Sequence, residues 1–407
     1  MGKFLILPLL KKNFAALYAA IQSKKVVSAW ALGLGGIAEA AFKMALGNGI
    51  GAKIDYEGDL FAQQFGGIVL EMAEDMDLGV AIGETVSEFT LTFGGETVAL
   101  APLEKAYESK LAGVFPYYGE GETVEAVSCG ANTWAKPAVL TRRPIAMIPA
   151  FPGTNCEVDT FRALERAGAE PRILLVNNLT PAAIGESLEK AVKLMKESQM
   201  VVFPGGFSGG DEPDGSGKFI TAFFRNPRMK DAVHDLLKNR DGLMLGICNG
   251  FQALVKLGLV PYGEIIDTDE NCPTLTFNTI GRHQSMLVRT RIASNKSPWL
   301  QKTAVGDEHL IAISHGEGRF VAGDDVVQTL VQNGQIATQY VDLSGSPTMD
   351  LRYNPNGSVL AIEGITSPDG RILGKMGHTE RTGRDLYKNV EGNIFQPLFE
   401  GGVEYFK

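Results

Sequence analysis

Short apolar runs alternate with amphipathic helical patterns between residues 144 and 257, and this alternation constrains the fold more than any other feature of the chain. The runs predict buried strands at 145–148, 172–176, 200–203 and 243–247, and the intervening patterns predict helices at 158–167, 180–197, 220–237 and 251–257. Strands that alternate with helices in this way favour a parallel sheet covered on both faces. After Pro261 the pattern changes to predicted hairpins, 274–278 with 285–292 and 359–365 with 371–376.

Cys248 lies at the predicted turn between the last of these strands and the helix that follows it. Gly246 and Gly250 flank it at two residues on either side, which is the layout of a nucleophile elbow in its cysteine form. Glycines permit a strained turn, and a helix N-terminus favours the reactive thiolate. A buried cysteine that merely ends a core strand is the alternative, but the glycines and the candidate partners favour a nucleophile.

Two further turns are expected at the same edge of the sheet, because ligands of such folds bind at the carboxyl ends of the strands. The sequence Pro-Gly-Gly-Phe at 204–207 follows one strand, and Phe-Pro-Gly-Thr-Asn at 151–155 follows another. An oxyanion hole needs two backbone N–H donors. We predict that Asn249 and Gly206 supply them, while a plain tight turn is the alternative for Gly205 and Gly206.

His315 is the histidine that the sequence favours as the catalytic base. It closes the apolar run 310–314, and Glu317 follows two residues later. Because side chains alternate along a strand, His315 and Glu317 share one face, where the carboxylate can orient the imidazole. The alternative is a surface His–Glu pair at a strand end.

Three motifs together resemble the class I (triad) glutamine amidotransferases: Gly-Ile-Cys-Asn-Gly-Phe-Gln at 246–252, Pro-Gly-Gly-Phe-Ser at 204–208 and His-Gly-Glu-Gly-Arg at 315–319. The sequence Pro-Gly-Thr-Asn-Cys-Glu at 152–157 narrows the resemblance to the glutaminase domains of phosphoribosylformylglycinamidine synthases. The resemblance covers about residues 144–400. It implies an α/β, flavodoxin-like amidotransferase domain at 144–407.

The resemblance also implies roles for individual residues. Cys248 would be the nucleophile, His315 the base and Glu317 the orienting acid. Gln252 and the turn at Gly205 and Gly206 would hold the glutamine substrate.

Two other elements of the family have counterparts in this chain. Asn278 and Arg282 match an Asn…Arg hairpin that would contact the substrate, although His-Gln stands at 283–284 where Phe-Glu is usual. His-Thr-Glu-Arg at 378–381 resembles a late family element, for which we expect sheet-edge packing and salt bridging rather than a place in the triad.

Residues 1–115 mix helical and strand patterns without a steady alternation, which predicts a smaller α+β domain. Residues 11–115 resemble the last part of the second aminoimidazole-ribonucleotide-synthetase-like domain of the same synthases. Trp-Ala-Leu-Gly-Leu at 30–34 stands where that family carries His-Asp-x-Ser-Asp, so no nucleotide-binding residue is assigned.

The sequence Gly-Leu-Gly-Gly-Ile-Ala at 33–38 imitates the glycine pattern of a dinucleotide-binding site. We do not assign a dinucleotide site to it. The polar, turn-rich residues 116–143 predict a linker.

The resemblance implies that the chain hydrolyses glutamine to glutamate and ammonia. The ammonia would serve the ATP-dependent conversion of formylglycinamide ribonucleotide to its amidine in de novo purine biosynthesis. No cofactor or metal is expected in this chain, because ATP and Mg²⁺ belong to the complete synthetase, whose domains or chain would be its partner beside glutamine. A stand-alone cysteine hydrolase and an assembly module that is inactive without a missing synthetase half remain alternatives.

Composition limits the other classes of function. A formal net charge of −9 without a basic block argues against a nucleic-acid partner. The four cysteines form no C-x-x-C pair, which predicts a reducing, cytoplasmic setting without disulfides or zinc. Glu39 and Lys43 interrupt the best apolar stretch, so no membrane span is expected.

Overall fold

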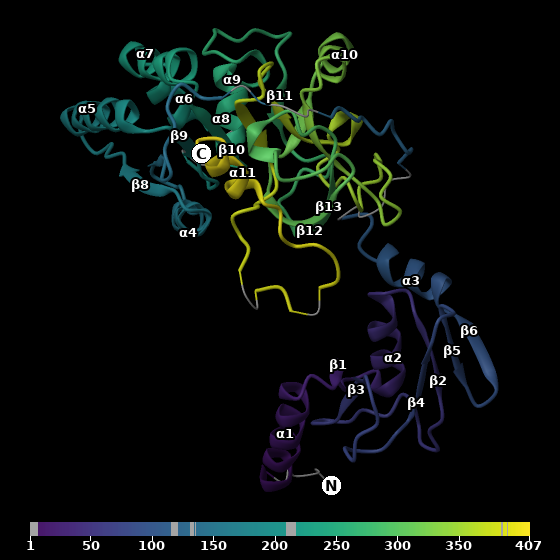
Figure 1. Ribbon diagram of the computed structural model, residues 1–407. Coiled ribbons are helices and arrows are strands. Elements are labelled where there is room, and N and C mark those ends of the chain that lie inside the picture. The colour runs from purple at the N-terminus through teal and green to yellow at the C-terminus, as the bar shows by residue number, and fades with distance from the viewer. Residues whose placement is uncertain are drawn as a thin grey trace. The chain divides into compact units, whose positions relative to one another are not determined.

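The computed structural model describes residues 7–114, 121–130, 134, 136–208, 217–383, 386–388 and 390–407. Contacts within the chain divide it into two compact units, Met1–Phe115 and Pro116–Lys407 (Figure 1). Within the described residues, no helix is both long and apolar enough to cross a membrane.

A nine-stranded sheet forms the centre of the larger unit, with the strand order β13-β12-β15-β16-β17-β10-β9-β7-β8. Its strands are β7 (Ile145–Ala150), β8 (Glu170–Leu175), β9 (Met200–Phe203), β10 (Leu243–Ile247), β12 (Gln284–Ile292), β13 (Glu308–His315), β15 (Ile336–Tyr340), β16 (Ile362–Thr366) and β17 (Ile372–Lys375). The five strands from β17 to β8 are parallel, and the remaining pairs are antiparallel. The predicted α/β fold with a parallel sheet is therefore confirmed for this unit.

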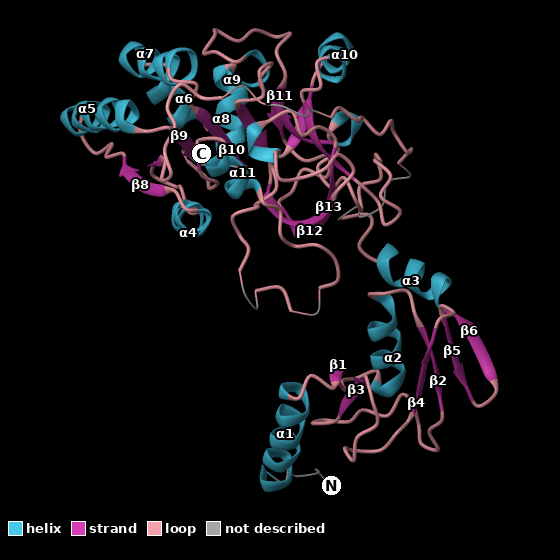
Figure 2. Ribbon diagram, in the orientation of Figure 1, coloured by secondary structure: helices cyan, strands magenta, loops and turns pink. Residues whose placement is uncertain are grey.

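Helices cover the parallel part of this sheet (Figure 2). They are α4 (Glu157–Ala167), α5 (Pro181–Glu197), α6 (Lys218–Phe224), α7 (Pro227–His234), α8 (Asn249–Leu257) and α11 (Leu398–Glu404). The short α9 (Leu259–Tyr262) contacts β16 and β17, and α10 (Asp324–Gln332) lies elsewhere in the unit. Local sequence explains their ends: the Thr180 hydroxyl caps α5 by accepting from the Ala183 N–H, and Gly168 ends α4 at φ 97°. Crossovers between parallel strands are right-handed, so α4 lies on the face opposite α5, and α4 packs against α11 there.

The core of the larger unit lies along the parallel strands. All residues of β9 and β10 are buried, and Phe203, Ile247 and Trp299 are completely so. Burial of each such side chain contributes about 1.5–3 kcal/mol. The carboxyl ends of these strands therefore emerge from a rigid base.

The pairing of one predicted hairpin is wrong. Residues 274–276 form β11 (Thr274–Thr276), which pairs with β14 (Arg319–Val321), whereas β12 pairs with β13 and β15. The other predicted hairpin is present as the antiparallel pair β16 and β17.

The described part of residues 116–143 packs onto the larger unit, so the prediction of a linker is wrong for it. Val127 is buried in the core, and its carbonyl oxygen accepts a hydrogen bond from Arg291. The backbone of Cys129 forms an isolated parallel β-bridge with Ser294, and the Trp134 indole N–H donates a hydrogen bond to the Lys296 carbonyl oxygen at 2.8 Å. Residues 115–120, 131–133 and 135 lie outside the described residues.

The smaller unit combines helices and strands. It contains α1 (Leu7–Gln22), β1 (Val26–Ala31), α2 (Gly36–Leu46), β2 (Gly51–Ile54), β3 (Ile68–Met72), β4 (Gly83–Val86), β5 (Thr90–Phe93), β6 (Glu96–Ala99) and α3 (Leu100–Ser109). At the imitation dinucleotide fingerprint, the Gly35 N–H just before α2 donates to the Glu39 carboxylate at 3.0 Å. An acidic side chain of the helix thus lies where a phosphate would bind, which agrees with discounting that motif.

Candidate active site

Cys248 lies between β10 and α8 in a strained backbone conformation, with φ 53° and ψ −108°. Positive φ at a residue other than glycine is uncommon, and such strain is concentrated at functional sites. The flanking glycines are required by packing: a Cβ on Gly250 would lie 2.2 Å from the Phe203 carbonyl oxygen, and one on Gly246 would lie 2.6 Å from the Gly250 carbonyl oxygen. The turn therefore holds a thiol above the sheet at the N-terminus of α8.

His378 and Glu380 approach Cys248 from the end of the neighbouring strand. Because β17 is parallel to β10 and Lys375 pairs with Ile247, the chain that leaves β17 passes the elbow. A Cβ placed on Gly205 would lie 2.7 Å from His378 Cε1 and 3.4 Å from Cys248 Cβ, so the imidazole and the cysteine meet over that glycine.

His378 is held as an imidazolium by its neighbours. Its Nδ1 lies 2.6 Å from Oε1 of Glu380, and both side chains are buried. Burial alone would lower the pKa of His378, but the charge of Glu380 and the contacts with the Cys248 and Cys156 thiols outweigh it and raise the pKa well above its ordinary value. The Nε2 atom of His378 has no hydrogen-bond partner within the described structure, so it remains available to a thiol or a substrate.

His315, the predicted base, has a different environment. Its Nδ1 lies 3.1 Å from Oδ1 of Asn278, and that oxygen also accepts from the Gly318 N–H. Burial, followed by the charges of His378 and His283, lowers the pKa of His315 to about 3, so the ring is neutral near pH 7. The prediction that Glu317 orients His315 is therefore wrong, because Asn278 is the partner of that ring.

The predicted assignment of the late His-Thr-Glu-Arg element to sheet-edge packing is wrong as well. His378 and Glu380 are a buried pair beside the thiol. Two His-x-Glu motifs each follow a strand, and local sequence does not distinguish them. The folded contacts do, because β13 reaches the thiol only through the Ser314 carbonyl oxygen, 3.9 Å from Cys248 Sγ, and the His315 ring pairs with Asn278. The His378 ring instead pairs with Glu380 and interacts with the Cys248 thiol.

The polar side-chain atoms of Asn278, a residue that the resemblance assigns to glutamine binding, are all engaged within the protein. Its Nδ2 donates to the carbonyl oxygens of Arg282 and His315, at 3.0 and 2.8 Å. Its Oδ1 receives the Gly318 N–H and the His315 ring nitrogen. An amide side chain has two donors and two acceptor sites, so the protein uses all of them.

The remaining predicted residues surround the elbow. The Asn249 N–H is at the first position of α8, where helix N–H groups have no partner in the helix. Gln252 links parts of the site, since it accepts from Asn249 Nδ2 and donates to the Glu317 carbonyl oxygen at 2.6 Å. Gly206 adopts φ 146°, and a Cβ there would lie 2.7 Å from Thr154 Cα. Their contacts with a substrate stay predictions: the oxyanion contacts of Asn249 and Gly206, and the glutamine contacts of Gly205, Gly206 and Gln252.

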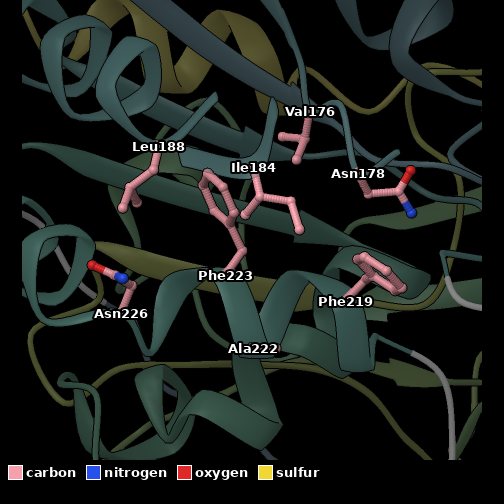
Figure 3. A pocket seen from close by; sticks show the side chains of 8 residues that line it. All are labelled: Val176, Asn178, Ile184, Leu188, Phe219, Ala222, Phe223 and Asn226. Atoms are coloured by element: carbon pink, nitrogen blue, oxygen red, sulfur yellow. The ribbon is translucent and has the colours of Figure 1, made fainter. Parts of the chain in front are cut away.

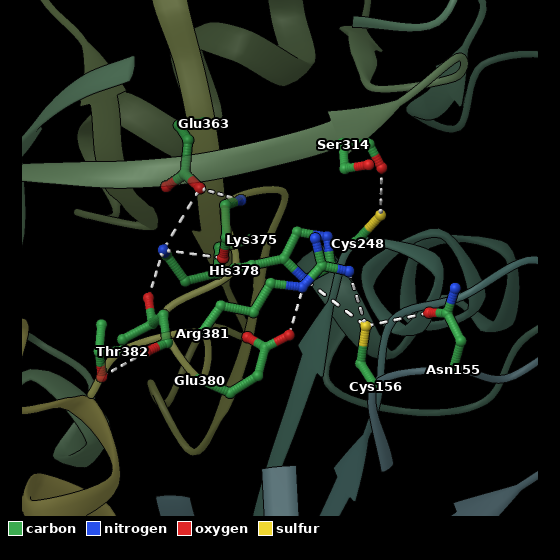
Figure 4. Close-up of polar contacts among 12 residues, drawn as sticks. Asn155, Cys156, Cys248, Ser314, Glu363, Lys375, His378, Glu380, Arg381 and Thr382 are labelled. Atoms are coloured by element: carbon green, nitrogen blue, oxygen red, sulfur yellow. Dashed lines mark hydrogen bonds and ion pairs between the residues drawn. The ribbon is translucent and has the colours of Figure 1, made fainter. Parts of the chain in front are cut away.

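Cys156 is a site residue that the sequence reasoning did not single out, although its motif was noted. It precedes α4, and its Sγ lies 3.0 Å from Arg381 Nη2 and 3.9 Å from His378 Nδ1 (Figure 4). Ligand-type atoms of Cys156, His378 and Glu380 lie within 4.8 Å of one another. The Arg381 guanidinium beside the sulfur opposes a cation there, so we assign no metal to this group.

An apolar hollow of about 200 Å³ lies between α5, α6 and the end of β8 (Figure 3). It is lined by Val176, Asn178, Ile184, Leu188, Phe219, Ala222, Phe223 and Asn226. None of these residues is a nucleophile, acid or base, so the chemistry is assigned to the elbow and not to this hollow.

A thiol on a strained strand–helix turn above a parallel sheet, beside a buried imidazole–carboxylate pair, defines a cysteine-dependent amide-cleaving site on an α/β fold. Comparison with known proteins agrees with that class. Residues 143–406 match the model of the CobB/CobQ-like glutamine amidotransferase domain. The chain belongs to this family of glutamine amidotransferases.

Two curated relatives are phosphoribosylformylglycinamidine synthase subunits named PurQ. The one from Methanococcus maripaludis is 33% identical over 278 residues, which cover 65% of this chain and 95% of the relative. The one from Treponema denticola is 34% identical over 281 residues, which cover 65% and 99%. A solved structure of PurLQS from Thermotoga maritima matches 65% of this chain and 100% of the other, at 24% identity and a TM-score of 0.47.

Proposed function

We propose that this chain is the glutaminase part of a phosphoribosylformylglycinamidine synthase. The observation that carries the proposal is the meeting of Cys248 with the His378–Glu380 pair at a strained elbow. Its similarity to PurQ subunits over nearly their whole length supports the substrate and the pathway.

The site residues suggest a sequence of steps. The Cys248 thiolate attacks the carboxamide carbon of glutamine, and the carbonyl oxygen gains negative charge that the Asn249 and Gly206 N–H groups would stabilise. Protonated His378 transfers its proton to the departing nitrogen, so ammonia leaves and a thioester forms on Cys248. Neutral His378 then takes a proton from water, whose oxygen attacks the thioester and releases glutamate.

Glu380 keeps His378 in the required state during these steps. Its carboxylate holds Nδ1 and favours the imidazolium that forms with the thiolate. Burial raises the pKa of Glu380, but the charge and hydrogen bond of His378 lower it overall, so the carboxylate stays ionised. The pair therefore acts as one proton-transferring unit.

The same reasoning extends to partners and place of action. We propose a synthetase chain or domains that bind ATP, Mg²⁺ and formylglycinamide ribonucleotide and receive the ammonia. The relatives bear the name of a synthase subunit, which supports a partner of this kind. All four cysteines are free thiols, which fits a reducing, cytoplasmic setting.

A glutamine-mimicking electrophile tests the proposal on the chain alone. We expect a chloroketone analogue of glutamine to add one label, mapped by mass spectrometry to Cys248, and glutamine to protect against it. Cys248→Ala should lose the label, whereas Cys272→Ser, a matched change of a partly exposed thiol, should keep it. Labelling at another cysteine, or release of products from peptides instead of glutamine, would contradict the proposal.

A further inference from the structure

Lys375 and Glu363 form a buried ion pair close to the candidate active site. Lys375 ends β17 and Glu363 lies in β16; their side chains are 1% and 0% exposed, and Nζ lies 3.4 Å from Oε1 (Figure 4). Removing two charges from water is costly, and an apolar pair of similar volume is often as stable or more so. Stability alone therefore gives a weak reason for this pair.

The pair binds the chain on both sides of His378. The Lys375 ammonium donates to the Gly377 carbonyl oxygen at 3.2 Å and to the Thr379 hydroxyl at 2.8 Å. The Glu363 carboxylate accepts from the Gly377 N–H at 2.6 Å. The residues immediately before and after His378 are thus fixed by one buried cation and one buried anion.

Lys375 also contacts the nucleophile through its backbone. Its carbonyl oxygen accepts a hydrogen bond from the Cys248 N–H at 2.9 Å. A single residue therefore connects the elbow that carries the thiol with the segment that carries the imidazole. Reacting groups need to be placed to within a fraction of an ångström, because errors near 1 Å reduce rates by about 100-fold.

The network continues away from the thiol. Glu363 also accepts from the Thr338 hydroxyl, and Thr379 donates to Gln396 Oε1 at 2.9 Å. The polar atoms of the two charged groups are engaged by this network and by each other, and the groups support the site by holding the segment that carries His378.

We infer that Lys375 and Glu363 are a positioning pair that sets His378 against the Cys248 thiol. The inference rests on the proposed glutaminase function. Lys375 and Glu363 themselves neither contact the substrate nor transfer a proton in this role.

Three variants of the whole chain separate positioning from stability: Lys375→Met, Glu363→Gln and the double variant. The rate of Cys248 labelling, measured at increasing concentrations of the chloroketone analogue, gives the maximal labelling rate and the analogue concentration at half of that rate. Thermal unfolding of each variant gives its melting temperature. Lys375→Met should lower the maximal rate by about 10- to 100-fold, since His378 loses its support, and change half-saturation by less than about threefold. It should also lower the melting temperature, because Glu363 is left buried without its cation.

The double variant provides the decisive comparison. It removes both charges, so the melting temperature should recover, while the labelling rate should stay low. Leu330→Ala, a core change in α10, is the control that lowers stability without slowing labelling. Recovery of the labelling rate together with stability, or wild-type labelling by Lys375→Met, would overturn the inference. Absence of labelling at Cys248 in the wild type would instead refute the proposed function itself.

Discussion

Replacing Gly205 by alanine places one methyl group where His378, Cys156 and Cys248 meet. The added Cβ would lie 2.7 Å from His378 Cε1, 3.2 Å from Cys156 Sγ and 3.4 Å from Cys248 Cβ. Carbon atoms pack at about 3.5 Å or more, so the imidazole has to move by roughly 0.8 Å. Gly205 is not among the positive-φ glycines, so alanine adds no backbone strain and the effect is steric.

A displacement of that size predicts a loss of glutaminase kcat of about 10- to 100-fold. Overpacking should reduce the free energy of unfolding by about 1–3 kcal/mol, which leaves the protein folded at assay temperature. Steady-state glutamate release gives kcat and KM, and urea unfolding gives stability.

Gly185→Ala is the matched control for Gly205→Ala. Gly185 lies inside α5, and a Cβ there has nothing within 4 Å, so alanine should leave the rate unchanged and add up to about 1 kcal/mol of stability. A Gly205→Ala protein that turns over glutamine at the wild-type rate would refute the placement of His378 over this glycine.

Two other changes have expected outcomes. In Glu380→Gln, the pKa of His378 should fall, because the carboxylate is the strongest of the groups that raise it against burial. His378 then loses its positive charge at lower pH than in wild type, so the alkaline limit of the pH range in which an imidazolium assists alkylation at Cys248 should move to lower pH. An unchanged pH profile would contradict this coupling. Asn278→Ala should reduce the free energy of unfolding by about 1–3 kcal/mol or more in urea, since it removes the side-chain partner of the Gly318 N–H and of the Arg282 and His315 carbonyl oxygens. A loss below about 0.5 kcal/mol would contradict the described network.

The parallel half of the fold could be predicted because its signals are local. Each strand of that half is a short apolar run, and the helices show the spacing of apolar residues typical of a helix. Thr180 and Gly168 mark a helix start and a helix end. Cys248 could be identified for the same reason, since glycines on both sides of a strand–helix turn are visible in the sequence.

The errors concern contacts between distant segments. Residues 274–276 pair with β14 and not with the adjacent strand in sequence, because pairing across the sheet is decided by packing. The segment at 121–130 looks polar and turn-rich, yet Val127 is in the core. The choice of His315 over His378 has the same origin: two His-x-Glu motifs look alike in the sequence, and only the folded contacts show that Glu380 pairs with His378 whereas Asn278 pairs with His315.

We propose that His378, and not His315, activates Cys248. Labelling of Cys248 by the glutamine-mimicking chloroketone, compared in His378→Asn and His315→Asn, tests it most directly. We predict that His378→Asn lowers the labelling rate by about 100-fold or more, because the Cys248 thiolate loses the imidazolium beside it, while His315→Asn stays within about tenfold of wild type. The reverse order of the two variants would contradict the assignment of His378.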